Sequence, residues 1–206
     1  RMRVPIVFWL QDIYSVAIGH ILRRKLSVLG LAIGKYYRRL ERNLLQKSDA
    51  IVAITEDFLP IIAKWGIVKE RCTVIQNWSP LSAISLQNKN NTWSRQRNLA
   101  DTNVVLYSGT LGLKHDPMLL VELAEQLRLR ADTIVLVISE GPGADLISKE
   151  AAKRDLKNLL VLPCQPFTEY SQVLGGADRR RARIVPEAGM FSVPSKGLSY
   201  LCAARA

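Results

Sequence analysis

The sequence predicts an α/β protein made of two domains, each with a parallel β-sheet. Apolar runs of strand length alternate with stretches of helical periodicity, first over residues 4–75 and again over 103–174. The 206 residues, 48% hydrophobic and 23% charged, are enough to bury the cores of two small domains. We therefore expect one domain over 1–80, a linker over 81–102 and a second domain over 103–206.

The first domain opens with VPIVFWL (4–10), an unbroken apolar run that is typical of a strand buried on both faces. A long basic helix over 20–47 follows it. Thr55 is placed to cap a further helix, whose first turn carries acids that suit the helix dipole. The remaining elements expected here are a strand over 50–54, the capped helix over 56–65 and a strand over 72–75.

The second domain repeats the alternation of strand and helix after a stretch rich in Ser, Asn and Gln. That stretch has room for one short helix over 92–98. The expected strands are 103–109, 133–138 and 158–163, and the expected helices are 116–128, 143–154 and 167–174, with a last helix that starts near Pro194.

The basic segment 20–47 combines an apolar stripe with a strong positive charge. It holds eight Lys or Arg residues and a single acid, Glu41, in a chain whose net charge is +11. Leucines and other apolar residues recur at steps of three and four from Leu22 to Leu44, which predicts that this face packs on a sheet. The basic face is then either simply solvated or a contact for anionic lipid. Gly30 and Gly34 are expected to bend or break the helix.

Composition excludes several classes of protein. No run of 18 uncharged apolar residues is present, and three widely spaced cysteines form no CxxC pair, so neither a bilayer span nor a zinc or redox pair is predicted. His20 and His115 are too far apart in sequence for a metal site. We expect a cytoplasmic location, peripheral at the inner face of the plasma membrane.

Two loops that follow strands of the second domain are candidates for ligand binding, because ligands of open parallel sheets bind beyond the carboxyl ends of the strands. In YSGTLGLKHDP (107–117), Gly109 lets the backbone approach an anion and Lys114 adds a charge, although any strand-to-helix turn needs a glycine. SEGPGADL (139–146) lacks the third glycine of a dinucleotide motif, so it is a plain turn that could border a nucleotide base.

Two acids complete the set of candidates. Asp12 follows the first strand, where a carboxylate either orients a hydroxyl for reaction or caps the next helix. Glu187 lies in PEAGMFSVPSK (186–196), ahead of a helix whose amides suit a phosphate. The plain alternative for this last loop is a proline-capped helix beside a solvated glutamate.

Together these motifs resemble the retaining glycosyltransferases of family 4, in their exopolysaccharide branch of the colanic acid type. The matching stretches are VFWLQD, SDAIVAITEDFLPIIAKWGI, VIQNW, VVLYSGTLGLKHDP, ISEGPG and PEAGMFSVPSKGLSYL. The resemblance covers nearly the whole chain and implies the GT-B fold of two Rossmann-like domains. It also implies a hexosyltransferase that moves a sugar from a nucleotide-diphosphate donor to a lipid-linked or saccharide acceptor in bacterial exopolysaccharide biosynthesis.

The resemblance assigns roles to individual residues. It implies that Asp12 and Glu187 are catalytic. The residues implied to bind the donor diphosphate are Gly109, Thr110, Lys114, Gly189, Phe191 and Ser192, and those implied beside the ribose and base are Ser199, Gly141 and Pro163. Neither a metal nor another cofactor is implied, since Lys114 and helix amides would neutralise the leaving diphosphate.

Some features depart from the family pattern. Ser199 stands where the family has the second of two glutamates, and Arg179–Arg183 lie where an apolar strand is expected. Buried without partners, these arginines would be costly, so they are expected at an exposed edge of the sheet unless this segment departs from the fold of its relatives. Family members are longer at both ends, so we expect this chain to be a fragment in which both domains are incomplete.

The alternative function is that of a non-catalytic basic protein that binds nucleic acid or anionic membrane through residues 20–47. The sequence lacks the interleaved aromatic residues of single-strand binders and has no recognisable reading helix. The partners we expect are therefore a nucleotide sugar, its acceptor and an anionic membrane surface, with no nucleic acid.

Overall fold

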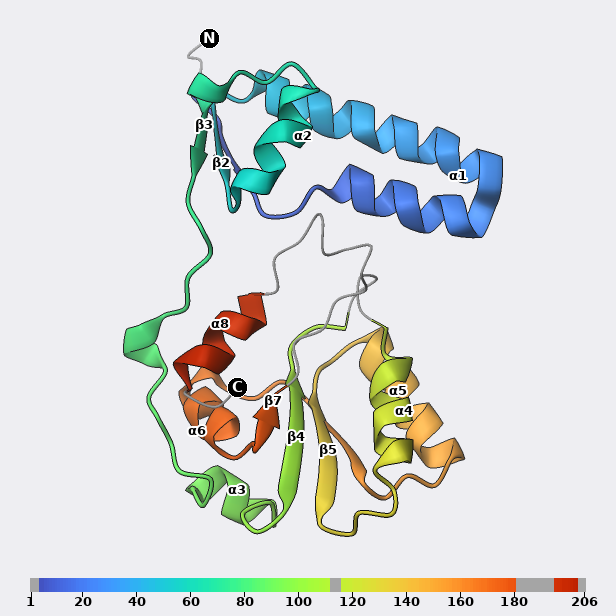
Figure 1. The fold of residues 1–206 in the computed structure, drawn as a ribbon, viewed down its shortest axis with the longest axis vertical. Coiled ribbons are helices and arrows are strands. Elements are labelled where there is room, and N and C mark those ends of the chain that lie inside the picture. Colours follow the sequence, from blue (N-terminus) through green and yellow to red (C-terminus); the bar gives the residue numbers. More distant parts are fainter. Residues whose placement is uncertain (1–3, 112–115, 181–194, 204–206) are drawn as a thin grey trace. The chain divides into compact units, whose positions relative to one another are not determined.

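The computed structural model describes every residue except 1–3, 112–115, 181–194 and 204–206 (Figure 1). The chain forms two compact units, with the change from unit 1 to unit 2 between Asn77 and Trp78. Both units are α/β with parallel sheets, as the sequence predicts. None of the helices described is long and apolar enough to cross a bilayer.

Unit 1 holds a three-stranded parallel sheet in the order β1-β2-β3. The predicted strands and the shorter helix are confirmed to within three residues, whereas the long helix begins six residues before the predicted start. Thr55 caps its helix by accepting a 3.3 Å hydrogen bond from the Asp57 amide. The elements are β1 (Val7–Leu10), α1 (Tyr14–Lys47), β2 (Ala50–Ala53), η1 (Glu56–Phe58), α2 (Leu59–Ala63), η2 (Lys69–Arg71) and β3 (Cys72–Val74).

Helix α1 is a hairpin of two arms rather than one straight rod. A Cβ added to Gly34 would lie 3.0 Å from the Gly19 Cα, although 15 residues of straight helix would separate the two by about 22 Å. Figure 1 shows the two arms of α1 running back along each other. The direction of the helix therefore reverses between Gly19 and Gly34. The expectation of a helix broken near its glycines is confirmed.

The first end of α1 is capped by a side chain of its own second arm, and the last end by a side chain that follows α2. Both carboxylate oxygens of Glu41, on the second arm, accept hydrogen bonds from the amides of Tyr14 and Ser15 at 3.0 and 3.1 Å. At the other end, Arg71 donates to the carbonyls of Leu45 and Gln46, both at 3.2 Å. These bonds satisfy terminal backbone groups that the helix itself leaves unpaired.

The predicted apolar face of the basic helix is not the buried one, so this prediction was wrong. Leu29 and Tyr36 are both 61% exposed, and Leu40 and Leu44 are exposed as well. The buried positions of the second arm include its two glycines and Leu45. Glycines allow the backbones of the two arms to meet, and this close approach, rather than apolar periodicity, sets which face turns inward.

Strand β1 was predicted to be buried on both faces, and this too was wrong. Val7 and Trp9 are 64% and 50% exposed, whereas Leu10 is fully buried. Helices α1 and α2 supply buried residues to the core that Leu10 joins, together with Ile51 of β2. The described part of unit 1 thus covers only one face of its sheet.

Unit 2 holds a four-stranded parallel sheet in the order β6-β5-β4-β7, with helices on both faces. Its predicted strands and helices are confirmed to within two residues. The elements are η3 (Leu81–Ala83), α3 (Thr92–Gln96), β4 (Asn103–Ser108), α4 (Met118–Gln126), β5 (Thr133–Ile138), α5 (Pro142–Lys153), β6 (Leu159–Leu162), η4 (Phe167–Glu169), α6 (Tyr170–Gly175), β7 (Arg179–Arg180) and α8 (Ser195–Cys202).

The sheet of unit 2 is buried on both faces. Alternate residues of β4 face two separate cores: Val104 and Leu106 belong to one, and Tyr107 belongs to the other. Residues of α6 and α8 complete the first core, and residues of α4 and α5 complete the second. Side chains of a strand alternate between the faces, so an unbroken apolar run fits this arrangement.

The stretch 81–102, expected to be a linker, packs on unit 2 instead. Trp93 and Leu99 are buried in its first core, and the Trp93 indole donates to the Gln165 side chain at 3.0 Å. Arg97 lies over the Trp93 ring, 4.4 Å from its centroid, and donates to the same Gln165 oxygen. The buried side chains of Trp93 and Leu99 therefore attach to unit 2 a segment whose polar composition suggested a linker.

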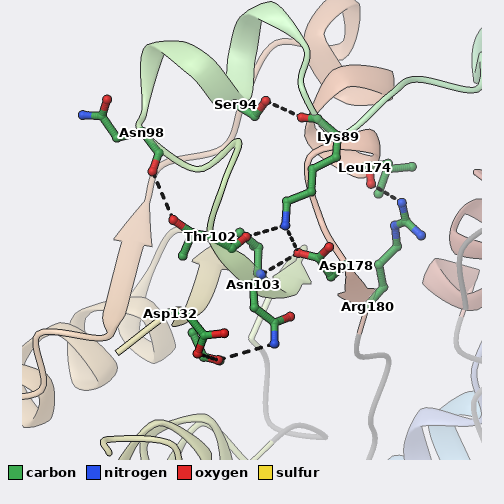
Figure 2. A network of polar contacts seen from close by, with 11 residues as sticks. Lys89, Ser94, Asn98, Thr102, Asn103, Asp132, Leu174, Asp178 and Arg180 are labelled. Carbon is green, nitrogen blue, oxygen red and sulfur yellow. Dashed lines mark hydrogen bonds and ion pairs between the residues drawn. The ribbon is translucent and has the colours of Figure 1, made fainter. Parts of the chain in front are cut away.

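A polar network fixes this segment to the sheet (Figure 2). The Lys89 ammonium contacts the Asp178 carboxylate and donates to the Thr102 carbonyl. Asp178 also accepts a 2.8 Å hydrogen bond from the amide of Val104 at the start of β4. One carboxylate thus joins three segments distant in sequence.

Strand β7 contains the first two residues of the arginine run and lies at the edge of the sheet. It pairs with β4 alone, and Arg179 is exposed, as an edge position allows. Arg180 is nevertheless buried, and its guanidinium donates to the Leu174 carbonyl (Figure 2). The rest of the arginine run, 181–183, lies outside the described residues.

Candidate functional site

The carboxyl ends of β4, β5 and β6 bring three loops to one edge of the unit 2 sheet. The strands are parallel and in register, with Ser108 opposite Ile138 and Ile138 opposite Leu162. The loops therefore begin at Gly109, Ser139 and Pro163. Ligands of open parallel sheets bind at such an edge, so the predicted Gly109, Thr110, Gly141 and Pro163 share the same region.

The loops after β4 and β5 are in direct contact. A Cβ added to Gly143 would lie 2.6 Å from the Leu111 Cβ and 2.7 Å from its carbonyl oxygen, so only glycine fits there. The loop after β4 is held further by Gly109, whose amide donates to the Ile138 carbonyl at 2.9 Å, and by Tyr107, whose hydroxyl donates to the Thr110 carbonyl at 3.0 Å. Thr110 is consequently fixed beside the first turn of α5.

The start of α5 offers hydrogen-bond donors to a ligand. Gly141 has φ +89°, which favours glycine, and Pro142 begins the helix. The Gly143 amide has no intrahelical acceptor, because the first turn of a helix leaves its N–H groups unpaired. The positive end of the dipole of this 12-residue helix also lies here. Such a terminus attracts anions.

Ser139, at the end of β5, is a site residue that the sequence analysis missed. It is 2% exposed, and its hydroxyl has no hydrogen-bond partner among the residues that the structure describes. A buried hydroxyl usually has a partner, so this one, close to the start of α5, is a candidate contact for a ligand. In the sequence it is a serine directly after the apolar run TIVLVI, which by itself does not mark a ligand contact.

Glu140 connects the loops after β5 and β6. Its carboxylate accepts a 2.9 Å hydrogen bond from the Cys164 amide, next to Pro163. Gln165, one residue further on, is held by Trp93 and Arg97, and its amide donates to the Pro163 carbonyl at 2.8 Å. These hydrogen bonds fix the loop after β6 to Glu140 and to the segment of Trp93 and Arg97.

Helix α8 closes the site on the side of β4. The Tyr200 hydroxyl accepts from the Ser108 amide at 3.2 Å and donates to the Ser108 carbonyl at 3.4 Å. Burial raises the pKa of Tyr200 to about 12, so the phenol keeps its proton at neutral pH. Ser199, predicted beside the ribose, shares a 3.2 Å hydrogen bond with the Ser79 hydroxyl. The role proposed for Ser199 stays a prediction.

Asp12 belongs to unit 1, at the carboxyl end of β1, and is half-buried. The charge of Asp12 is the main cause that raises the pKa of Tyr14, with burial and a hydrogen bond to Asp12 adding to it. The helix-capping alternative for Asp12 is not supported at the Tyr14 and Ser15 amides, because Glu41 occupies both. Asp12 as a catalytic residue stays a prediction.

The other predicted site residues, Lys114, Glu187, Gly189, Phe191 and Ser192, lie outside the described residues. The expected meeting of the Lys114 and Glu187 loops at one diphosphate therefore stays a prediction. Among the residues that are described, no group of three or more His, Cys, Asp or Glu side chains could hold a metal ion.

The whole chain was compared with protein families, curated proteins and solved structures. No family model matches the chain. It is homologous to WcaI of Escherichia coli (strain K12), named as a colanic acid biosynthesis glycosyl transferase, with 25% identity over 141 residues. The match covers 67% of this chain and 34% of WcaI.

Solved structures show the same fold. Anabaena HepE, crystallised with UDP and glucose, matches 98% of this chain with a TM-score of 0.71 and 14% identity, over 51% of its own length. WaaG, a glycosyltransferase of lipopolysaccharide biosynthesis, matches 99% of the chain with a TM-score of 0.69 and 17% identity, over 56% of its length. The predicted fold class, α/β with the Rossmann-like parallel sheets of GT-B glycosyltransferases, is confirmed. The chain spans about half the length of these structures.

Proposed function

We propose that this chain is part of a retaining GT-B glycosyltransferase of family 4. In this proposal the enzyme transfers a hexose from a nucleotide-diphosphate donor to a lipid-linked or saccharide acceptor during bacterial exopolysaccharide biosynthesis. The observation that carries the proposal is the edge of unit 2 where the loops after β4 and β5 close over the start of α5. The homology to WcaI and the UDP bound by HepE support it.

The described residues suit the binding of a nucleotide diphosphate. Gly109 and Thr110 present backbone close to the amides at the start of α5, where a diphosphate would be stabilised by the helix dipole. The Ser139 hydroxyl offers one more hydrogen bond. Gly141 and Pro163 border the ribose and base in this proposal, and Ser199 lies on α8 beside the same strand end.

The proposed chemistry stabilises charge on the leaving diphosphate. Lys114 and helix amides would neutralise the charge that develops as the bond to the sugar breaks, which is the kind of stabilisation that contributes most to many enzymes. Glu187 would accept hydrogen bonds from sugar hydroxyls, and Asp12 would orient the acceptor hydroxyl. The proposal includes no resident metal or cofactor, with the nucleotide sugar as substrate.

A peripheral membrane contact through residues 20–47 belongs to the same proposal, at the cytoplasmic face of the plasma membrane. An exposed apolar flank on the second arm of α1 supports it, since Leu29, Tyr36, Leu40 and Leu44 are 46% to 61% exposed. Such residues beside Lys and Arg suit a helix that lies in a lipid interface.

Titration of the chain with UDP and with GDP, followed by calorimetry, tests donor binding. We expect saturable binding of one nucleotide, weakened roughly ten- to a hundredfold by Lys114→Ala because a charge-assisted contact to phosphate is lost. Lys149→Ala, which removes an exposed lysine from the middle of α5, is the matched control and should leave the affinity unchanged. Absence of saturable binding, or equal effects of both variants, would contradict the proposal.

A further inference from the structure

We propose that a hollow on the second arm of α1 binds a phosphate group of a mono- or diphosphate ligand. Four cations line this hollow of about 550 Å³: Lys35, Arg38, Arg39 and Arg42. Asn43, Gln46 and Trp65 complete its lining. The site lies on the same arm as the proposed membrane contact but on another side of the helix, and it rests on the proposed function only for the source of the phosphate.

The sequence spacing gathers these charges on one side of the helix. Lys35, Arg38 and Arg42 follow one another at steps of three and four, and Arg39 lies four residues after Lys35. Residues at these steps are neighbours on a helix surface. The three guanidinium groups present planar pairs of N–H donors, which match the geometry of phosphate oxygens better than a lysine does. The same fork also matches a carboxylate, but four cations around one hollow favour an anion with more than one charge, such as a phosphate group.

No protein group that the structure describes compensates these charges. None of the four cations forms an ion pair with a described acid. Glu41 is the single acid of the segment, and its two oxygens are occupied by the Tyr14 and Ser15 amides. Like charges at these spacings repel one another. An anionic ligand would relieve that repulsion.

The dipole of α1 does not account for the cluster. A helix C-terminus favours cations only within about its last turn, and Lys47 is the basic residue there. The cluster begins three turns earlier, at Lys35. The cluster lies instead beside Trp65, which is 8% exposed and lines the same hollow. The side-chain amide of Gln46, another lining residue, donates to the Trp65 carbonyl at 2.8 Å and so holds Trp65 against the arm.

The hollow is separate from the apolar flank of the same arm. At 100° per residue, the centre of the flank formed by Leu29, Tyr36, Leu40 and Leu44 lies roughly 150° around the helix from the centre of the four cations. A bilayer that receives this flank would not lie flat against the cations. The hollow is thus suited to an individual phosphate group, carried either by a lipid headgroup or by a soluble compound.

The experiment measures binding by the full chain and by two variants with the same loss of charge. Arg38→Gln/Arg42→Gln removes two cations of the hollow, and Arg128→Gln/Arg130→Gln removes two exposed cations of unit 2 as the matched control. All four side chains are exposed, so both variants should fold, which circular dichroism verifies. One probe is inorganic pyrophosphate, whose binding is measured by calorimetry. The other is phosphatidylcholine vesicles with and without phosphatidic acid, whose binding is measured by co-sedimentation.

We expect the hollow variant to bind pyrophosphate, acidic vesicles or both roughly thirtyfold more weakly, from about 1 kcal/mol per cation, while the control changes little. Loss with vesicles alone identifies a lipid headgroup as the source, and loss with pyrophosphate alone identifies a soluble phosphate. Equal losses in both variants, no binding by the unaltered chain, or tighter binding of an RNA oligonucleotide at the same residues would overturn the proposal. UDP affinity, measured on the same samples, should be unchanged, which separates this test from that of the donor site.

Discussion

The two sheets of this protein start from similar sequence and reach different degrees of burial. In unit 2, β4 and β5 are apolar runs whose two faces enter two separate cores. In unit 1, β1 is an equally unbroken apolar run, yet Val7 and Trp9 on one face are largely exposed. An apolar run therefore shows only that both faces of a strand can be buried. Whether both are buried depends on helices that cover the second face of the sheet.

The strongest test of this comparison is to replace a valine by alanine in each of the two sheets. Val104→Ala removes two methyl groups from a fully buried position of β4, and we expect a loss of about 2–3 kcal/mol in the free energy of unfolding of unit 2. Val7→Ala, at a 64%-exposed position of β1, should change the stability of unit 1 by less than about 0.5 kcal/mol.

Urea denaturation, with hydrogen exchange to assign each transition to a unit, would measure the pair. Equal losses at Val104 and Val7 would show that the outer face of β1 is covered after all. The comparison of the two sheets would then have to be abandoned.

A second prediction compares the close glycine contacts of the two units. Gly143→Ala would force its Cβ to within 2.6 Å of Leu111, and overpacking of this kind costs about 1–3 kcal/mol. Gly34→Ala meets the Gly19 backbone at 3.0 Å, so we expect a smaller loss, offset in part by the better helix propensity of alanine.

Gly19→Ala is the matched control, because a Cβ there meets nothing within 4 Å. It should raise stability by up to about 1 kcal/mol. Thermal unfolding measures the stability of the three variants, which should rise from Gly143→Ala through Gly34→Ala to Gly19→Ala. Gly143→Ala should also bind the donor more weakly, because the loop after β4 shifts. A stabilising Gly143→Ala would mean that the contact between the loops after β4 and β5 is loose.

The smallest expected effect is a pH dependence of the stability of unit 2. Burial raises the pKa of Tyr200 from 10 to about 12 in the folded protein. The stability that this phenol contributes is fully present below pH 10 and is lost as the pH rises toward 12. Burial raises the pKa of Tyr107 as well, so it acts in the same direction.

Tyr200→Phe removes one titrating group together with its hydrogen bonds to Ser108, which are worth about 1 kcal/mol at neutral pH. Denaturation at pH 8 and pH 11 should therefore show a shallower loss in the variant than in the unaltered chain. An identical slope in both proteins would indicate that the phenol is solvated and that α8 is not tied to β4.

Local patterns were sufficient to locate most elements. The spans of β4, β5 and α5 follow from apolar run length and from glycine and proline at the turns, because these signals act over a few residues. Residues 81–102 were predicted to be a linker because the segment is mostly polar. In the structure two long-range contacts attach it to unit 2: Trp93 is buried in a core, and Lys89 pairs with Asp178. Contacts 89 residues apart leave no periodic signal.

The candidate site shows the same division. Gly109 and Gly141 could be identified from their places after strands, since positive φ there requires glycine. Ser139 could not, because a serine becomes notable only once it is buried without a hydrogen-bond partner. Likewise, the sequence predicted a basic face on the helix of segment 20–47, but the hollow beside Trp65 depends on how α1 packs.

The amino-acid sequence by itself determined the α/β class, the order of strands and helices, and the positions of the glycine turns, because propensity and patterning act locally along the chain. Only the tertiary structure decided that α1 folds back on itself, which of its faces turns inward, and which face of each sheet is covered. Those outcomes depend on steric fit between distant segments, such as the meeting of Gly19 and Gly34, and fit of that kind exists only once both backbones are in place.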